Sequence, residues 1–336
     1  MKRLLILIFL LFGDLSLFSQ PKIIFDTDIG SDADDLGALA MLHTFIKRGD
    51  CELLAVMNWS LEENAVSAID AVNRYYLHPN IQIGTRKGQT FKDEANYNRV
   101  IAENFSFKLS FDDVPDATEL YRKILSTARD TSITIITVGP LANIENLIKS
   151  GSDNYSSLNG AELISKKVKE FVIMGGQFPK GKDEWNFNGD MPGVTKFVLE
   201  NLKAPITFTG FELGSQIKTG EIFNNIDPET PLYKGFLYYS GHAPWMKDNF
   251  KGKILSNSSF DQTAVLYAVK SGVGAYWDKV DGGFCEADET GGNKWVRRKN
   301  SNQAYLKLKE SPEVMSTLIE VLMLDKVDEF IEMEEE

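Results

Sequence analysis

The chain has 336 residues, of which 43% are hydrophobic and 25% are charged, a composition typical of folded globular proteins. It carries 48 acidic and 36 basic residues, so its formal net charge is −12. This acidity argues against a nucleic-acid polymer as partner, because such binding draws on clustered Lys and Arg. The two cysteines, Cys51 and Cys285, lie outside any Cys/His cluster, which excludes a disulfide-rich framework and argues against a zinc site.

The N-terminus predicts an export signal. Lys2 and Arg3 precede an apolar run of nine residues, 4–12, and small polar residues follow near position 20. That run is about half the length of a membrane-spanning helix, whereas a charged start and a short apolar core are typical of a secretory signal peptide. We therefore expect residues 1–20 to be a signal peptide and 21–336 to form an exported domain, periplasmic or secreted, with no membrane association after signal removal. A buried N-terminal strand or helix is the alternative.

After residue 20, short β-branched runs alternate with amphipathic stretches, the pattern of a parallel sheet with crossover helices. In chain order we predict strands at 22–25, 52–57, 81–84, 133–138, 170–174 and 206–211. Apolar spacing predicts helices at 35–47, 63–76, 117–129, 144–149, 195–202, 263–271 and 312–330. Residues 282–302 indicate turns and a hairpin. No repeat or composition break marks a boundary, so we expect one α/β domain with a single open, mainly parallel, Rossmann-like sheet and flanking helices.

An aspartate cluster follows the first predicted strand and opens the first predicted helix. The segment FDTDIGSDADD places five aspartates within ten residues, at Asp26, Asp28, Asp32, Asp34 and Asp35. Carboxylates this close repel one another, and a hard cation is the usual means of offsetting that repulsion. A helix N-cap would need only one of them. Because ligands bind beyond the carboxyl ends of strands in open α/β sheets, this cluster predicts a metal or phosphoryl site.

One enzyme class that fits this cluster is a haloacid-dehalogenase-like phosphohydrolase. In that class, Asp26 and Asp28 would serve as nucleophile and acid, and Asp112, Asp113 and Asp116 would hold Mg²⁺. That family expects a Gly-Thr/Val run after its second aspartate, whereas three further acids follow Asp28. The phosphohydrolase is therefore kept as the alternative enzyme.

Four segments, in order, resemble the inosine-uridine-preferring nucleoside hydrolase family. They are FDTDIGSDADD at 25–35, TVGPLANI at 137–144, FVIMGGQF…EWNFNGDMPGVTKFVL at 171–199 and SSFDQTAVLYAV at 258–269. Together they span roughly residues 22–270, and their order and spacing make the combination specific. The resemblance implies the nucleoside hydrolase fold and hydrolysis of the N-glycosidic bond of ribonucleosides or related ribosyl compounds, with release of base and ribose.

The resemblance also implies a bound calcium ion. In this family the ion is held by aspartates of the first motif, a main-chain carbonyl of the second and the late aspartate, which here are Asp28, Asp35, the carbonyl of Val138 and Asp261. Oxygen-only ligands independently suit a hard, loosely coordinated cation. Asp28 would also be the catalytic general base that takes a proton from water. The role of Asp32 is left open.

The substrate-binding residues are implied in the same way, and they comprise Asp34, Glu184, Asn186, Phe260, Asn58 and His242. Asp34, Glu184 and Asn186 would bind the sugar hydroxyls. Phe260 stands where many members carry a His that assists the departing base, so it would stack on a purine instead; a core-facing Phe at a helix start is the alternative. Asn58 would stand in for the family's Asn after the second strand, and His242 would line the base pocket.

The base half of the site departs from the family pattern. The family's His-Gly motif is absent, because residues 91–105 contain no His. A relative that binds nucleosides or sugars but has lost leaving-group chemistry is therefore the non-enzyme alternative. The expected partner in either case is a small-molecule nucleoside or ribosyl compound. Family members commonly form homo-oligomers, so the resemblance allows a homo-oligomer here.

Overall fold

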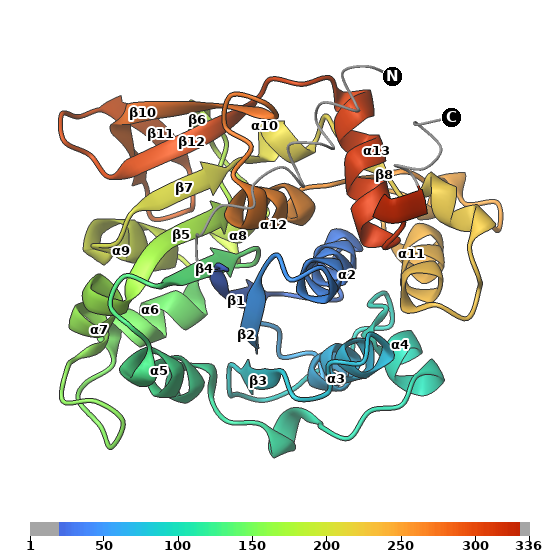
Figure 1. Ribbon diagram of the computed structural model, residues 1–336, viewed down its shortest axis with the longest axis horizontal. Coiled ribbons are helices and arrows are strands. Elements are labelled where there is room, and N and C mark those ends of the chain that lie inside the picture. The colour runs from blue at the N-terminus through green and yellow to red at the C-terminus, as the bar shows by residue number, and fades with distance from the viewer. Residues whose placement is uncertain (1–19, 330–336) are drawn as a thin grey trace.

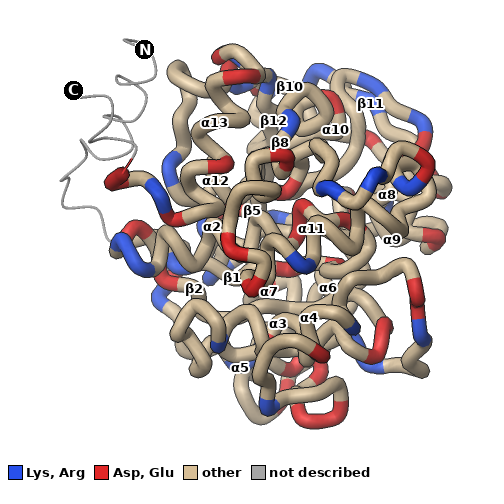
Figure 2. Tube along the Cα trace, turned by 90° about the vertical axis from the view of Figure 1, so that its right-hand side faces the viewer, with Lys and Arg blue, Asp and Glu red and all other residues tan. Residues whose placement is uncertain are grey.

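The structure, a computed structural model, describes residues 20–329 of the chain. The predicted export signal therefore lies outside the described residues, apart from Gln20. Within residues 20–329, no helix is both long and apolar enough to cross a membrane. Figure 2 shows that Lys and Arg, like Asp and Glu, are scattered along the trace.

A ten-stranded sheet forms the centre of the fold, in the order β3-β2-β1-β4-β5-β7-β12-β10-β11-β6 (Figure 1). Its parallel strands are β1 (Lys22–Thr27), β2 (Glu52–Asn58), β3 (Gln82–Thr85), β4 (Ile133–Thr137), β5 (Val168–Met174), β7 (Ile206–Thr209) and β12 (Gln303–Leu308). The antiparallel edge consists of β10 (Trp277–Ala287), β11 (Asn293–Arg297) and β6 (Lys180–Gly181). The predicted mainly parallel α/β architecture is confirmed.

Helices cover both faces of this sheet, and each face has its own apolar core. One core contains residues of α2 (Asp34–Lys47), α3 (Ala65–Tyr75), α4 (Asn98–Asn104), α11 (Pro231–His242), α12 (Asp261–Lys270) and α13 (Pro312–Met323). The other contains residues of α5 (Ala117–Thr127), α6 (Ala142–Lys149), α7 (Gly160–Lys167) and α9 (Val194–Asn201). The strands serve both cores because alternate side chains point to opposite faces. In β1, Ile23 and Phe25 pack into the first core and Ile24 into the second.

The strand order reverses beside β1, and this reversal positions the site. β1 pairs with β2 on one side and with β4 on the other, all in parallel. The chain therefore builds outward through β2 and β3 and then returns to begin the other half at β4. Such a switch point is where ligands bind in open α/β sheets, beyond the carboxyl ends of the strands. Here the loops after β1 and β4 meet at that edge.

Several elements differ from the sequence-based prediction. The helix predicted at 312–330 ends as α13 at Met323. The predicted hairpin contains β10 and β11, but β12, which joins them to the parallel sheet through β7, was not predicted. Helix α11 was also missed, because its sequence PLYKGFLYYSGH is rich in aromatic residues and Gly rather than in strong helix formers.

Candidate active site

The loop after β1 brings the aspartate cluster to the sheet edge. Asp28 follows the last residue of β1, and Gly30 turns the chain with a φ of 113°, in the region that favours glycine. A Cβ at Gly30 would also overlap the side chains of Asn96 and Asn98. Helix α2 then begins at Asp34, which places two acidic residues in its first turn, where the helix dipole favours negative charge.

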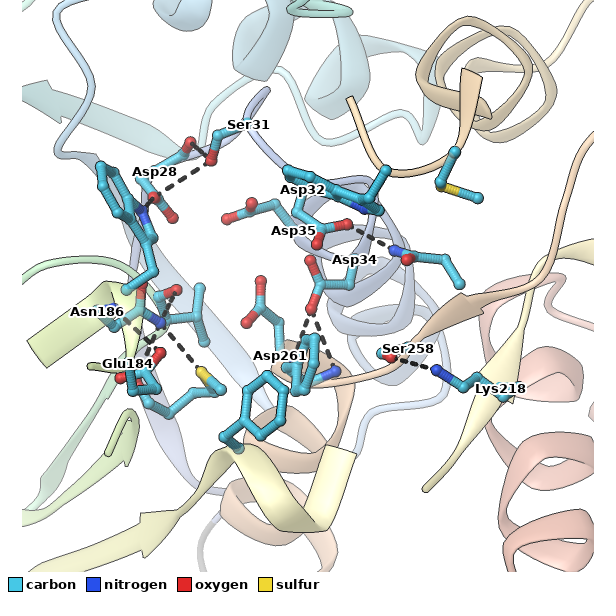
Figure 3. A pocket seen from close by; sticks show the side chains of 18 of the residues that line it. Asp28, Ser31, Asp32, Asp34, Asp35, Glu184, Asn186, Lys218, Ser258 and Asp261 are labelled. Carbon is cyan, nitrogen blue, oxygen red and sulfur yellow. Dashed lines mark hydrogen bonds between the residues drawn. The ribbon is translucent and has the colours of Figure 1, made fainter. Parts of the chain in front are cut away.

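Three carboxylates form a compact buried group, made of Asp34 and Asp35 at the start of α2 and Asp261 at the start of α12 (Figure 3). One ligand atom from each lies within 4.8 Å of the other two. Oδ2 of Asp34 accepts hydrogen bonds from the backbone N–H groups of Phe260 and Asp261, at 3.1 and 3.2 Å. These bonds tie the N-terminus of α2 to that of α12, so the two helices hold the group together.

The electrostatics of this group fit a cation. Burial, followed by the charges of neighbouring aspartates, raises the pKa of Asp34, Asp35 and Asp261 well above the usual 3.8. No Lys or Arg among residues 20–329 forms an ion pair with any of the three. Thr27 donates a hydrogen bond to Asp35, but the Asp261 carboxylate accepts none within the described part of the chain. Buried carboxylates without compensating donors are costly, and a hard divalent cation would offset that cost.

Asp28 lies in the same pocket but is held apart from the compact group. Its Oδ2 accepts hydrogen bonds from the indole N–H of Trp185 at 3.1 Å and from the Ser31 hydroxyl at 3.3 Å. Gly139, after β4, permits this packing, because a Cβ there would lie 2.9 Å from Oδ1 of Asp28. Burial raises the pKa of Asp28 to about 6. The compact group thus consists of Asp34, Asp35 and Asp261, and Asp28, expected from the sequence to be a ligand, lines the same pocket outside this group.

The carbonyl of Val138, a calcium ligand expected from the resemblance, belongs to a residue that lines the pocket just after β4. It accepts a hydrogen bond of 2.8 Å from Nδ2 of Asn186, which also donates to the carbonyl of Met174 at 3.2 Å. The Asn186 amide thus bridges the ends of β4 and β5. This explains the position of Asn186 after the Met-Gly-Gly segment, and Asn186 also lines the pocket.

Glu184 caps the short helix α8 (Trp185–Asn188) and lines the pocket. Its carboxylate accepts backbone hydrogen bonds from Gly176 at 2.6 Å, Asn186 at 3.0 Å and Phe187 at 3.1 Å. Burial nevertheless raises its pKa to about 7. Glu184 therefore orders the loop that carries both Trp185 and Asn186, in addition to facing the pocket.

These residues line a pocket of about 890 Å³, which lies within the range of small-molecule sites. The sequence predicted the acidic residues of this pocket but not most of its aromatic residues. Trp185 and Trp245 are 47% and 64% exposed, and Phe260 stacks on Phe211 of α10 (Phe211–Gly214) with ring centroids 5.1 Å apart. Trp185 could have been predicted from its position inside the Glu-Trp-Asn motif, whereas no sequence motif marks Phe211.

A family model described as inosine-uridine preferring nucleoside hydrolase matches residues 23–315. The chain belongs to this family. Two solved structures are similar over 91% of this chain and 94% of their own: the effector protein XOO4466, with a TM-score of 0.66 and 12% identity, and the type III effector protein XopQ complexed with adenosine diphosphate ribose, with a TM-score of 0.62 and 14% identity. At such identities the likeness shows the fold alone. No curated protein sequence matches significantly.

Two residues assigned to substrate binding from the nucleoside hydrolase resemblance lie outside the pocket lining. Asn58 is fully buried, and its side chain is used in hydrogen bonds to the carbonyl of Ser60 and the hydroxyl of Thr85. His242 lies on α11, stacked on Tyr238 with ring centroids 3.7 Å apart, and its Nδ1 is 2.8 Å from that residue's carbonyl oxygen. Both assignments are corrected: Asn58 supports the sheet edge, and His242 packs on its own helix.

The aspartates that would serve a phosphohydrolase do not form one site in this protein. Asp113 accepts hydrogen bonds from Ser110 at the start of a 3₁₀ turn, and Asp116 caps α5. Asp26 is buried, and its oxygens accept hydrogen bonds from the Tyr121 hydroxyl at 2.8 Å and Asn143 at 3.0 Å. Asp26 thus anchors the sheet edge and does not line the pocket.

Proposed function

We propose that the protein hydrolyses the N-glycosidic bond of ribonucleosides or related ribosyl compounds and releases base and ribose, with Ca²⁺ as cofactor. Family membership supports hydrolysis of N-glycosyl bonds as the general class of activity. The observation that carries the proposal is the buried trio Asp34, Asp35 and Asp261 beside Asp28 at the carboxyl ends of β1 and β4. The ligand of the similarly folded XopQ, adenosine diphosphate ribose, is likewise a ribosyl compound.

Asp34, Asp35 and Asp261 would hold the cation, with the Val138 carbonyl and Asp28 available from the same pocket wall. Calcium fits this donor set, because it takes six to eight oxygen ligands in flexible geometry. When bound, the ion would supply positive charge that favours ionisation of water and would ligate sugar hydroxyls.

Asp28 would act as the general base. Its Oδ2 is occupied by the Trp185 and Ser31 donors, so Oδ1 is the oxygen that would take a proton from the attacking water. A pKa raised by burial to about 6 gives the carboxylate more basicity than an exposed aspartate while leaving it mostly ionised at neutral pH. Trp185 and Ser31 would hold the carboxylate in one orientation during the proton transfer.

The remaining pocket residues suit the sugar and the departing base. Water attack at the anomeric carbon builds positive charge on the sugar ring, which the surrounding carboxylates would stabilise without reorganising. Glu184 and Asn186 lie on the wall that would contact the sugar hydroxyls. The stacked pair Phe211 and Phe260 offers an aromatic surface for a purine.

The test is to incubate purified protein with a panel of ribosyl compounds, with Ca²⁺ and after chelation, and to measure free base and ribose. We expect release with Ca²⁺, loss of release on chelation, and a fall of at least about 10²-fold in Asp28→Asn, the usual contribution of a general base. Asp183→Asn, at an exposed carboxylate on the pocket rim, is the matched control. Phosphate release from a phosphomonoester with Mg²⁺ would instead favour the phosphohydrolase.

A second candidate function is binding without turnover. No His lines the pocket among the described residues, so the usual proton donor to a departing base is missing. If the protein binds nucleosides tightly with Ca²⁺ and all ligand is recovered unchanged, the protein is a binding protein rather than a hydrolase. The predicted export signal at 1–20 would place either function in the periplasm or outside the cell.

A further inference from the structure

A lysine lies in the wall of the acidic pocket, across the aspartate group from Asp28 (Figure 3). Lys218 begins the short strand β8 (Lys218–Thr219), which pairs antiparallel with β9 (Asn257–Ser258) and sets Lys218 opposite Ser258. The Nζ of Lys218 donates a hydrogen bond of 2.6 Å to the Ser258 hydroxyl oxygen. Both side chains line the pocket, so the ribbon presents an ammonium and a hydroxyl side by side to a ligand.

Lys218 is a basic residue in a pocket whose other charged lining residues are acidic. Seven carboxylates and one cation, Lys218, stand among the described residues that line the pocket. Lys218 nevertheless forms no ion pair within residues 20–329. The hydroxyl of Ser258, to which it donates a hydrogen bond, is an uncharged acceptor. Its charge is therefore available to a ligand. A neutral nucleoside would gain nothing from an ammonium at this position, whereas an anionic substituent would.

The neighbouring groups match a phosphoryl oxygen. Because the Ser258 oxygen accepts from Lys218, its own hydroxyl proton is available to donate. Asn249 also lines this pocket. Ser256 is turned toward Glu221, to which its hydroxyl donates at 3.2 Å, so Lys218 and Ser258 carry the site. A lysine ammonium with hydroxyl donors is a common arrangement for binding phosphate.

The pocket also has room for such a group. Its volume of about 890 Å³ is near the top of the range for small-molecule sites. Asp34 and Asp261, which are proposed to hold the cation that ligates the sugar hydroxyls, lie between Asp28 and Lys218 in Figure 3. A ribosyl ligand seated on the aspartate group would therefore have Asp28 on one side and Lys218 on the other.

We propose that Lys218 and Ser258 form a subsite for a phosphoryl group, so that the substrates are phosphorylated ribosyl compounds rather than neutral nucleosides. The proposal rests on the proposed function, because it assumes that the ribose binds at the aspartate group. It concerns binding alone: the phosphoryl group stays attached, and the bond cleaved remains the N-glycosidic bond.

The test compares the affinities of a nucleoside and its 5′-monophosphate by calorimetry, with Ca²⁺ present, for the wild type, Lys218→Gln and Lys247→Gln. Lys247 is the matched control, because it is exposed close to Trp245 and Met246 of the pocket but does not line it. We expect the wild type to bind the monophosphate about tenfold more tightly, as one charge-assisted hydrogen bond allows. The preference should disappear in Lys218→Gln and persist in Lys247→Gln, and added salt should weaken it.

An unchanged preference in Lys218→Gln, tighter binding of the nucleoside by the wild type, or no binding of either ligand would overturn the subsite. Measuring base release in the same samples separates this inference from the proposed function. Lys218-dependent preference without base release supports the subsite and contradicts the hydrolase. Base release with no preference for the monophosphate supports the hydrolase and contradicts the subsite.

Discussion

The indole N–H of Trp185 donates a hydrogen bond to Oδ2 of Asp28 across 3.1 Å, and the two residues are 157 positions apart in the chain. This bond joins the start of α8 to the loop after β1. It fixes one oxygen of the proposed general base, Oδ2, and so restricts the orientation of the carboxylate. The tryptophan is thus a positioning residue as well as part of the aromatic wall.

Trp185→Phe removes the N–H and keeps an aromatic ring. We expect kcat to fall about tenfold, since one hydrogen bond to a charged group contributes about 1.5 kcal/mol or more. KM should change less, because the ring surface is retained. Trp245→Phe is the control: Trp245 also lines the pocket but does not bond to Asp28. Equal effects of the two substitutions on kcat would contradict the positioning role of Trp185.

Asp261→Asn should weaken calcium binding at least about tenfold, because it removes one of three carboxylates that share the proposed cation and leaves a weaker amide ligand. Calorimetric titration with Ca²⁺ measures the change. The comparison is Asp28→Asn, which alters a residue outside the compact group and should reduce calcium affinity less. A larger loss in Asp28→Asn than in Asp261→Asn would instead indicate that Asp28 contributes more to calcium binding than Asp261 does.

Removing calcium should make stability fall as the pH rises. Burial raises the pKa of Asp28 to about 6 and that of Glu184 to about 7, above ordinary values of 3.8 and 4.5. Groups with raised pKa values stabilise the folded state below their unfolded pKa, and this contribution is lost as the pH rises through the folded pKa. The Tm of chelated protein, followed by circular dichroism, should therefore drop between about pH 4 and pH 7. Added calcium should restore the Tm. If the Tm of the chelated protein instead rises from about pH 4 to pH 7, the raised pKa values of Asp28 and Glu184 are contradicted.

Much of this fold could be predicted from local pattern, and part of the site could not. The run of aspartates after β1 and the order of the family segments led to the correct sheet and pocket edge. The misassigned Asn58 and His242 show the limit, because their side-chain directions depend on packing that no spacing rule contains. Likewise, the hydrogen bond that Asp28 accepts from Trp185 joins residues distant in sequence, so no local pattern could predict it.

A buried arginine away from the site gives a separate test of the fold. Arg122 donates to both oxygens of Asp153, at 2.6 and 3.0 Å, and these hydrogen bonds lower the pKa of Asp153 to about 2. A lowered pKa stabilises the folded state above the unfolded pKa, and the contribution is lost as the pH falls through the folded pKa. In urea unfolding, Asp153→Asn should therefore be less stable than the wild type above about pH 4, and the gap should close toward about pH 2. Asp281→Asn, at an exposed residue, should show no such pH dependence.

The most direct test of the central claim is hydrolysis in ¹⁸O-labelled water, with Ca²⁺ present and a ribosyl compound as substrate. If water attacks the anomeric carbon, as proposed for Asp28 acting as base, mass spectrometry will find one label in the released ribose, none in the base and none in any attached phosphate. Label in released phosphate, or recovery of all the substrate intact, would contradict the account.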